Sequence, residues 1–568
     1  TLINVQTGRN IVSSISTQTT DDNSWVNELN RILYSYSVVE YIIHFSPSVQ
    51  LSDKDILSRF DTMMNKSYSF NNYKKDIKQF SKISYQNDIL NKVFNLNNML
   101  LPIEYFDWER KSELVLSYIL MLHHVYIHKA DLINNISIPK EESESDFLKI
   151  TSDGIRQLNV VSNTNNYKGK GDSLITLLNK CKTGMGRRFF KERLLTPSIN
   201  IDVIEKSYEN IYLYSQDNFY NDIRSSLGKI SDLEKSLRNM GLEELYDTNN
   251  LFSDSVAYDF VLKTIQSIID YERIDISNHL VLFDEFREYV DYIKSIFEFD
   301  NFSSISSNNS IEKSIFKRGF CKEIDELDDK ITEHLNNIHR ICEKFSTLID
   351  NKKNVKAVRY DYNDKNDHFI YCTKKRGLTI IEKFKNMNNK SIFVYDNNNN
   401  LLYKFNKDDV LMKPKDGSNS IIDLEVIRKI STDLLTLNKQ IKNMNKILWD
   451  RTIKEIYTKY RKILTLMNEF IAEVDFYSCG AFLSISNNYH RPKTDSTADK
   501  AFIQATEIRH PIIESISDKE FIRNNIILGK EGQDGILLYG VNAGGKSTLM
   551  KSVGLNIIMA QAGLYVAA

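Results

Sequence analysis

Apolar residues recur at three- and four-residue steps over residues 421–479, a stretch that contains no Pro and no Gly. This spacing puts them on one face of an α-helix. An unbroken helix of that length would extend roughly 85 Å. Such a helix is too long for a compact core, so the pattern predicts a lever or coiled arm.

Two further patterns precede this helix. Apolar spacing over residues 150–350 is mostly helical, as in SLITLLNKCK at 173–182. Over residues 351–417, short β-branched and aromatic runs such as HFIYC and SIFVYD are separated by Asn, Asp and Gly. We therefore expect a small β-rich insertion between helical segments, carried at the tip of two arms.

The first 130 residues mix strand and helix patterns. LINV at 2–5 and VVEYIIHF at 38–45 read as short strands, and WVNELNRILYSY at 25–36 reads as an amphipathic helix between them. This order predicts a small α/β domain. Residues 111–133 predict a long helix that leads out of it.

Close to the C-terminal end, GVNAGGKS satisfies the pattern G-x-x-x-x-G-K-[ST] through Gly540, Gly545, Lys546 and Ser547. The apolar run GILLY at 535–539 predicts a buried strand directly before it, and a helical pattern follows directly after it. A Gly-rich turn without function is the alternative, but a strand and a helix on the two sides argue against it.

The spacing of this loop suits a nucleotide phosphate. Small residues let backbone N–H groups wrap the anion, and the helix that follows directs the positive end of its dipole at it. Lys546 would reach the β- and γ-phosphates, and the Ser547 hydroxyl would bind Mg²⁺. The candidate residues for binding ATP or ADP in this loop are Gly540, Asn542, Ala543, Gly544, Gly545, Lys546, Ser547 and Thr548.

Composition limits the class of protein. Hydrophobic residues make up 41% and charged residues 26% of the 568, and the formal net charge is −1. These values indicate a globular protein that is not a polycation, so nucleic-acid binding would need a local patch. Five scattered cysteines suit a reducing, intracellular compartment. Composition does not indicate which compartment this is. No run of 18 apolar residues predicts a membrane span.

The β-rich insertion is the basic part of the chain. Residues 351–417 hold 15 Lys or Arg against 8 Asp or Glu, a net charge of +7. The clusters suggest contact with nucleic-acid phosphates, with Tyr371 and Tyr403 interleaved. A solvated surface is the alternative, and charge alone favours it. The candidate DNA-binding residues are Lys374, Lys375, Arg376, Lys413 and Lys415.

Three histidines lie on the predicted helix at 111–133. His124 and His128 share a face at a spacing that suits metal ligation, and His123 lies beside them in sequence. No carboxylate accompanies them on that face. Packing of the helix is therefore the favoured interpretation.

Several segments together resemble the MutS family of DNA mismatch-recognition ATPases. The loop GVNAGGKST is similar to that family's GPNMGGKST, with Val541 in place of Pro and Ala543 in place of Met. The resemblance covers essentially the whole chain. The other similar segments are residues 173–197, RGFCKEIDELDD at 318–329, residues 473–492, RHPIIE at 509–514 and FIRNNI at 521–526.

The resemblance implies a multidomain layout and an activity. It implies ATP-dependent recognition of mismatched double-stranded DNA, a sliding clamp, a dimer formed through the ATPase heads, and catalytic roles for Lys546 and Ser547. Phe521 would stack on adenine, with Ile522 beside it. The expected parts are an α/β connector at 1–130, a helical lever at 131–350 and 418–492, a β-rich clamp at 351–417, and the start of a P-loop, ABC-type α/β ATPase domain at 493–568.

Two of the family's parts have no counterpart in the chain: the mismatch-reading domain with its Phe-x-Glu wedge, and the strand with the Walker B acidic pair. We therefore expect a piece of a longer protein that does not hydrolyse ATP as it stands. The biased composition suggests a giant-virus or organellar branch. A relative that clamps DNA junctions without reading mismatches stays open. A chromosome-structuring coiled-coil ATPase is disfavoured, because its phosphate loop would precede the coils.

Overall fold

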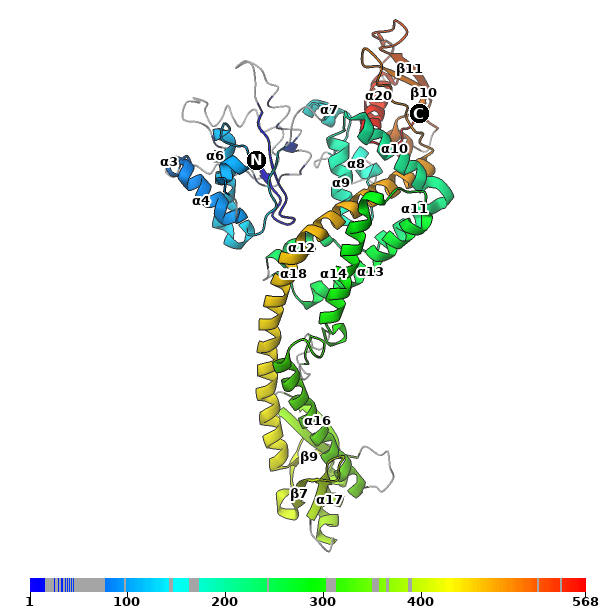
Figure 1. Ribbon diagram of the computed structural model, residues 1–568. Coiled ribbons are helices and arrows are strands. Elements are labelled where there is room, and N and C mark those ends of the chain that lie inside the picture. Colours follow the sequence, from blue (N-terminus) through cyan, green and yellow to red (C-terminus); the bar gives the residue numbers. More distant parts are fainter. Residues whose placement is uncertain are drawn as a thin grey trace. The chain divides into compact units, whose positions relative to one another are not determined.

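The computed structural model describes most of the chain (Figure 1). The described part comprises residues 1–15, scattered positions between 25 and 44, and residues 77–568 without 97–98, 142–146, 163–172, 243–244, 303–312, 350–356, 364–366, 387–390, 518–519 and 542–543. It is mostly helical, with small sheets, and forms two compact units. The first unit comprises Thr1–Arg287 with Tyr457–Ala568, and the second comprises Glu288–Ile456. No helix of the described part is long and apolar enough to cross a bilayer.

The predicted long helix is confirmed as α18, Glu425–Asn487, which has 63 residues. It continues through Gly480, one residue beyond the stretch that contains no Gly. A Cβ at Gly480 would lie 2.6 Å from Cδ1 of Ile211 on helix α10, Ile201–Ser215. The glycine therefore lets the two helices approach closely.

The first unit begins with a three-stranded sheet in the order β1-β2-β3, in which β1 and β2 are antiparallel and β2 and β3 are parallel. The predicted strand at 2–5 is present as β1, whereas the strand predicted at 38–45 and the helix predicted at 25–36 lie mostly outside the described residues. The elements of this part are β1 (Leu2–Ile3), β2 (Asn10–Val12), α3 (Ile77–Phe80), α4 (Ile83–Phe94), α5 (Pro102–Tyr105), α6 (Ser112–His128), η1 (Ala130–Ile133) and β3 (Lys140–Glu141).

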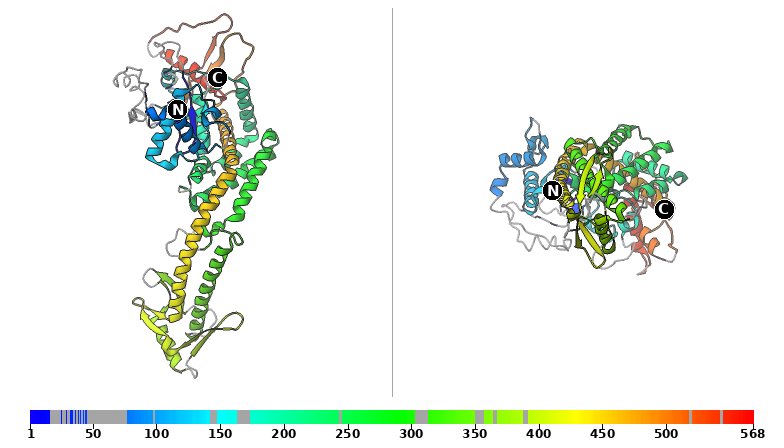
Figure 2. Two further views of the ribbon diagram at one scale, coloured as in Figure 1. Left: turned by 60° about the vertical axis from the view of Figure 1, so that its left-hand side comes forward. Right: turned by 90° about the horizontal axis from the view of Figure 1, so that it is seen from below.

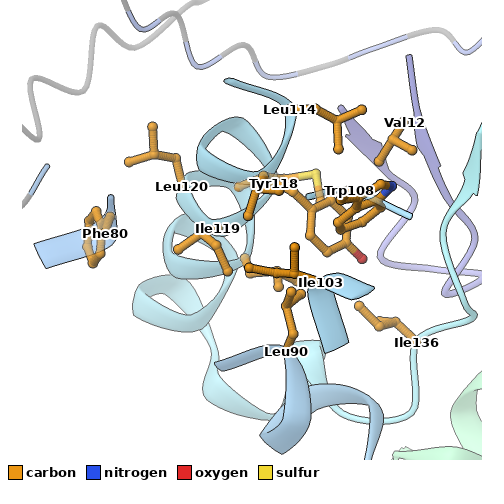
Figure 3. Close-up of a cluster of buried hydrophobic side chains, with 13 residues drawn as sticks. Val12, Phe80, Leu90, Ile103, Trp108, Leu114, Tyr118, Ile119, Leu120 and Ile136 are labelled. Carbon is orange, nitrogen blue, oxygen red and sulfur yellow. The ribbon is translucent and has the colours of Figure 1, made fainter. Parts of the chain in front are cut away.

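The helix predicted at 111–133 is shorter than expected. Helix α6 ends at His128 because Lys129 has an extended backbone, and the chain continues as the 3₁₀ turn η1. The buried face of α6 forms the centre of an apolar cluster (Figure 3). Tyr118 packs edge-on against Trp108 at 5.3 Å between ring centroids, and its hydroxyl donates to Oδ1 of Asn10 at 2.8 Å. That hydrogen bond satisfies a fully buried phenol and joins α6 to β2.

The rest of the first unit is helical, apart from a two-stranded antiparallel sheet near its end. Its elements are α7 (Ser152–Gln157), α8 (Leu174–Leu178), α9 (Gly184–Leu195), α10, η3 (Gln216–Asn218), α11 (Phe219–Leu227), α12 (Leu233–Gly241), α13 (Thr248–Tyr271), η4 (Ser277–His279), the start of α14 (Leu280–Ile296), the end of α18, β10 (Ile503–Ile508), α19 (Pro511–Ile516), β11 (Asn524–Leu528) and α20 (Lys546–Gln561).

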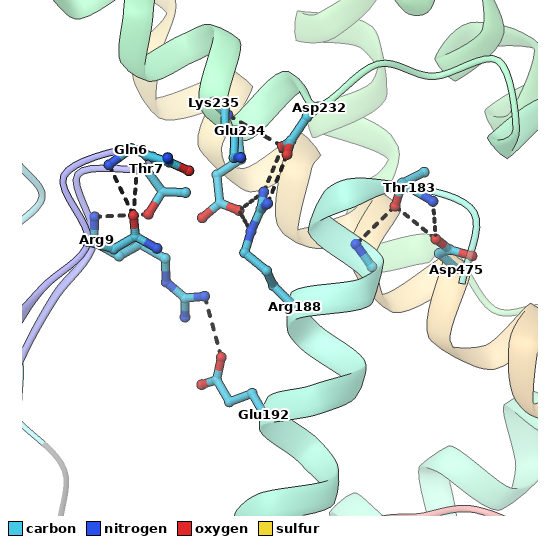
Figure 4. A network of polar contacts seen from close by, with 12 residues as sticks. Gln6, Thr7, Arg9, Thr183, Arg188, Glu192, Asp232, Glu234, Lys235 and Asp475 are labelled. Atoms are coloured by element: carbon cyan, nitrogen blue, oxygen red, sulfur yellow. Dashed lines mark hydrogen bonds and ion pairs between the residues drawn. The ribbon is translucent and has the colours of Figure 1, made fainter. Parts of the chain in front are cut away.

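A buried carboxylate on α18 holds the start of α9 (Figure 4). Asp475 accepts hydrogen bonds from the backbone N–H of Lys182 at 3.0 Å, and from the N–H and hydroxyl of Thr183 at 2.7 and 2.8 Å. Thr183 in turn caps α9 by accepting from the N–H of Gly186. Burial raises the pKa of Asp475, and the three donors oppose that rise. The segments 173–197 and 473–492 therefore meet at this carboxylate.

The second unit is built on two long helices and a sheet (Figures 1 and 2). Both figures show α16 and the first part of α18 running side by side towards the sheet. Phe345 near the end of α16 packs against Phe384 and Phe405, with ring centroids 6.4 and 5.7 Å away. The elements are the end of α14, η5 (Phe299–Asn301), α16 (Lys322–Ile349), β4 (Arg359–Asn363), β5 (Asp367–Thr373), α17 (Lys374–Asn386), β6 (Ser391–Tyr395), β7 (Leu401–Asn406), η6 (Lys407–Asp409), β8 (Leu411–Pro414), β9 (Asn419–Asp423) and the start of α18.

The insertion between these helices has strands, and it also has a helix that the sequence patterns did not predict. An antiparallel sheet in the order β4-β5-β9-β8 pairs Ile370 with Ile422, and β6 and β7 form a separate hairpin. Strand β9 lies just beyond residue 417, where the predicted insertion ends. Residues 374–386 form α17, in which Ile380 and Phe384 are buried. These two residues are four apart, so they lie on one helical face.

At the other end of α18, a buried arginine joins three helices of the first unit. The guanidinium of Arg509 donates to the carbonyls of Asn487 and Asn488, at 3.4 and 2.6 Å, and pairs with Glu514 on α19 at 2.7 Å. The carbonyl of Arg509 accepts from Nδ2 of Asn556 on α20 at 3.0 Å. Arg509 therefore satisfies carbonyls that the end of α18 leaves without helical partners, and it fixes α20 beside that end.

The next residue, His510, caps α19. Its Nδ1 accepts a hydrogen bond from the N–H of Ile513 at 3.2 Å, which requires a neutral imidazole. Burial and, to a smaller extent, the charge of Lys551 lower the pKa of His510 to about 4. The folded protein therefore holds His510 without a proton at pH values where an unfolded histidine takes one up.

We expect His510 to make the protein less stable in mild acid. Its folded pKa lies below the unfolded value of about 6.5, so its contribution is complete above that pH and is lost as the pH falls towards 4. The loss should be roughly 1–2 kcal/mol. His510→Asn keeps a good N-cap but cannot titrate. Urea midpoints measured from pH 7.5 to pH 4 should therefore fall less steeply for the variant, and equal slopes would contradict this account.

Candidate functional site

The Gly-rich loop leads directly into α20. Gly545 is the residue before the helix and has φ +82, a left-handed conformation that glycine adopts without strain. A Cβ at Gly544 would lie 3.0 Å from the carbonyl oxygen of Val541, so the loop is tight there. Asn542 and Ala543 lie outside the described residues.

Lys546, the first residue of α20, turns back over the loop. Its ammonium donates to the carbonyl oxygens of Gly540 at 2.6 Å and Val541 at 2.8 Å. The loop thus curls round a cation, and the sequence pattern gave no sign of this contact. An anion that reached the loop would meet this positive charge at once.

The first turn of α20 adds further donors. Ser547 is exposed and Thr548 is half-buried, and both lie in the turn whose N–H groups have no helical partner. The carbonyl of Thr548 accepts from the hydroxyl of Ser552 at 2.9 Å, inside the helix. This end of α20 can therefore offer backbone N–H groups and a hydroxyl to an anion or its counter-ion.

The far end of α20 is fixed to the rest of the unit. Oδ1 of Asn556 accepts from the N–H of Ala567 at 2.7 Å, while its amide nitrogen donates to Arg509. The hydroxyl of Tyr208 on α10 donates to the carbonyl of Ala560 at 2.8 Å. The loop therefore lies at the exposed end of a helix whose other end is held by α10 and, through Arg509, by α18.

The strand predicted at residues 535–539 is wrong for this structure. Residues 535–540 have no strand conformation, and the side chains of Leu537 and Tyr539 are 88% and 90% exposed. A buried strand needs neighbours on both sides, and the nearby strands β10 and β11 pair only with each other in the described chain. The apolar run is typical of a buried strand, but no described strand lies beside it to pair with.

The residues expected near adenine lie on a different segment. Phe521 is half-buried and Ile522 is 80% exposed, and both precede β11. Their role in contacting adenine stays a prediction.

The basic residues at 374–376 open helix α17. Lys374 and Lys375 are exposed and Arg376 is half-buried. The backbone N–H of Lys374 donates to the carbonyl of Ser418 at 3.0 Å, which ties the helix start to the sheet. The three cations interact unfavourably with the positive end of the α17 dipole. No acidic residue lies in that first turn to offset this repulsion. An anion bound there would relieve this repulsion.

The other two predicted DNA-binding lysines are paired with carboxylates. Lys415 contacts Asp361 at 2.8 Å and lies 3.6 Å from the ring centroid of Tyr371, and its side chain is only 18% exposed. The hydrogen bond from Lys415 lowers the pKa of Asp361. Lys413 pairs with Asp423 at 2.7 Å. Sequence alone missed both partners, because Asp361 lies on β4, 54 residues before Lys415, and Asp423 is brought beside Lys413 only by the pairing of β8 with β9.

A comparison with models of protein families identifies the central part of the chain. Residues 153–481 match the family model described as MutS domain III. The match covers the helices of the first unit from α7 to α14, all of the second unit, and most of α18.

Comparison with individual proteins gives relatives of low identity and wide coverage. A mutS homolog of Acanthamoeba polyphaga mimivirus is 26% identical over all of this chain and 55% of its own length. A mitochondrial DNA mismatch repair protein, the mutS homolog of Sarcophyton glaucum, is 28% identical over 71% of this chain and 38% of its own length.

A third relative, the DNA mismatch repair protein MutS of Borrelia garinii subsp. bavariensis, is 24% identical over 96% of this chain and 56% of its own length. The chain therefore spans about half the length of the relatives it matches, or less. Because the family model covers more than half of the chain, the chain belongs to the MutS family.

Proposed function

We propose that the protein is a MutS-type DNA mismatch repair ATPase, in which nucleotide bound at the start of α20 controls the grip of a clamp on double-stranded DNA. The observation that carries the proposal is the helix start at Gly545 and Lys546 in a chain of this family. The relatives' names favour mismatch repair over a clamp for DNA junctions.

The loop residues fit the phosphates of ATP or ADP. The ammonium of Lys546 rests on two loop carbonyls that a phosphate could replace as its partner, and Gly545 leaves the helix start open, since a Cβ there would meet nothing within 4 Å. Ser547 would hold Mg²⁺ through its hydroxyl. Bound ATP with Mg²⁺ would supply the phosphoanhydride chemistry. The proposed nucleotide-binding residues are Phe521, Ile522, Gly540, Asn542, Ala543, Gly544, Gly545, Lys546, Ser547 and Thr548.

The nucleotide's effect would pass along α20. If Lys546 leaves Gly540 and Val541 for a phosphate, the loop and the first turn of α20 must adjust. The far end of α20 is held by Tyr208 and, through Asn556, by Arg509 at the end of α18. An adjustment of the loop would therefore shift α20 and alter the hydrogen bonds that Arg509 makes at the end of α18.

The DNA would be held by the start of α17. Lys374, Lys375 and Arg376 concentrate positive charge where the helix dipole adds to it, and phosphate oxygens suit such a place. Lys413 and Lys415 belong to the same basic surface, but their carboxylate partners give them a smaller share in our proposal. We also propose a dimer through the ATPase heads, because the family resemblance implies one.

Lys546→Ala should weaken ATP binding by the full-length protein at least tenfold. The substitution removes a charge-assisted contact with phosphate, which contributes roughly 1.5–3 kcal/mol. Titration calorimetry with ATP would measure the change. Lys493→Ala, which removes an exposed lysine outside the loop, is the matched control and should bind as the parent does. Equal ATP affinity in Lys546→Ala and the parent would remove the loop from the proposal.

Replacing Lys374, Lys375 and Arg376 with Ala should weaken binding to matched and mismatched DNA alike. Phosphate contacts carry no sequence information, and each one lost should flatten the slope of log affinity against log salt by about one unit. Fluorescence anisotropy over a salt series gives that slope. The control removes Lys330, Lys344 and Lys446, three exposed lysines of the same unit. A triple variant with the parent's slope would support a merely solvated surface.

A further inference from the structure

Three side chains of metal-ligating types lie together in the first unit, and none of them belongs to the phosphate loop. They are His124 and His128 on α6, and Glu40. Their ligand atoms all lie within 4.8 Å of one another. The spacing of the histidines is visible in the sequence, but the carboxylate comes from 84 residues before His124 and is brought there only by the fold.

The three side chains lie close to one another. Nε2 of His124 lies 3.1 Å from Oε1 of Glu40. The rings of His124 and His128 lie 4.5 Å apart between centroids at an angle of 67°. His124 is 6% exposed and held by the core, whereas His128 and Glu40 are exposed. The His124 side chain is thus fixed in position, whereas the exposed side chains of His128 and Glu40 can rotate.

The donor set suits one class of ion. Two imidazole nitrogens and one carboxylate oxygen, with water in the fourth place, form a tetrahedral set that Zn²⁺ accepts. With bonds of about 2.0–2.2 Å, ligand atoms in such a tetrahedron lie roughly 3.3–3.6 Å apart. The widest separation here is at most 4.8 Å, so it must close by no more than about 1.5 Å, which rotation of His128 and Glu40 can supply.

A hydrogen bond between His124 and Glu40 explains that pair without a metal. It does not account for the second imidazole, which lies one turn along the same helix face and within reach of the same carboxylate. His123, the neighbour in sequence, instead packs its ring 4.7 Å from that of Phe80. Among the three histidines of α6, the two that share a face with each other are the two that share Glu40.

We propose that Glu40, His124 and His128 form a surface site for Zn²⁺ or a similar first-row divalent ion. The bound ion crosslinks the segment at Glu40 to the last turn of α6. Because the two parts are far apart in sequence, binding stabilises the folded state over the unfolded chain.

The test uses the full-length protein, stripped of metal with a chelator and then titrated with Zn²⁺ in a calorimeter. The parent should bind one Zn²⁺ more tightly than a variant that combines Glu40→Gln, His124→Gln and His128→Gln. His128→Gln alone, at an exposed position where folding is not at risk, should weaken that event roughly tenfold or more. His123→Gln and Glu113→Gln on the same helix are the controls and should bind Zn²⁺ as the parent does.

A second readout separates a metal site from a packing role. Co²⁺ in place of Zn²⁺ should give the visible absorption bands of a tetrahedral nitrogen and oxygen site in the parent and in both controls, and His128→Gln should lose them. The melting temperature of the parent should rise on addition of Zn²⁺, and that of His128→Gln should not. Zn²⁺ binding of equal affinity in the parent, His128→Gln and the triple variant would overturn the proposal, as would no binding by the parent.

Discussion

The buried guanidinium of Arg509 is the contact on which the arrangement of the first unit most depends. It donates to Asn487 and Asn488 at the end of α18 and pairs with Glu514 on α19, while its backbone carbonyl holds Asn556 on α20. A buried cation is costly unless it is paired and its donors are satisfied. The partners of Arg509 must therefore stay in place together, and that requirement fixes the end of the long helix beside the helix that begins at the phosphate loop.

This constraint gives the proposed function a physical route. The loop is exposed and its lysine is held by two carbonyls, so that end of α20 can change its partners. The other end of α20 is held by hydrogen bonds through Asn556 and Tyr208. In the proposed function, a change at the first end would be transmitted because hydrogen bonds hold the second end in place. Asp475 holds α9 against α18 in a similar way, because its carboxylate accepts hydrogen bonds from Thr183 at the start of α9.

Sequence patterns predicted the elements whose signals are local. The helical spacing at 421–479 gave α18, and the Gly-Lys step gave the start of α20. Contacts between residues that are distant in sequence could not be predicted from these patterns. The run at 535–539 reads as a buried strand, but the described chain has no strand to pair with it. The role of Lys415 in binding DNA stays a prediction, but the sequence did not show that Asp361 and Tyr371 contact this lysine. Glu40 completes the histidine pair from 84 residues away, and only the fold brings it there.

The most direct test of the account is the effect of ATP on the lifetime of the complex with mismatched DNA, measured by stopped-flow for the full-length parent and for Asn556→Ala. The substitution removes the bonds from α20 to Arg509 and Ala567, far along the helix from the loop. The account predicts that the variant still binds ATP, and binds DNA without nucleotide, while ATP no longer changes the lifetime as it does in the parent. An ATP effect of the parent's size in Asn556→Ala would contradict it.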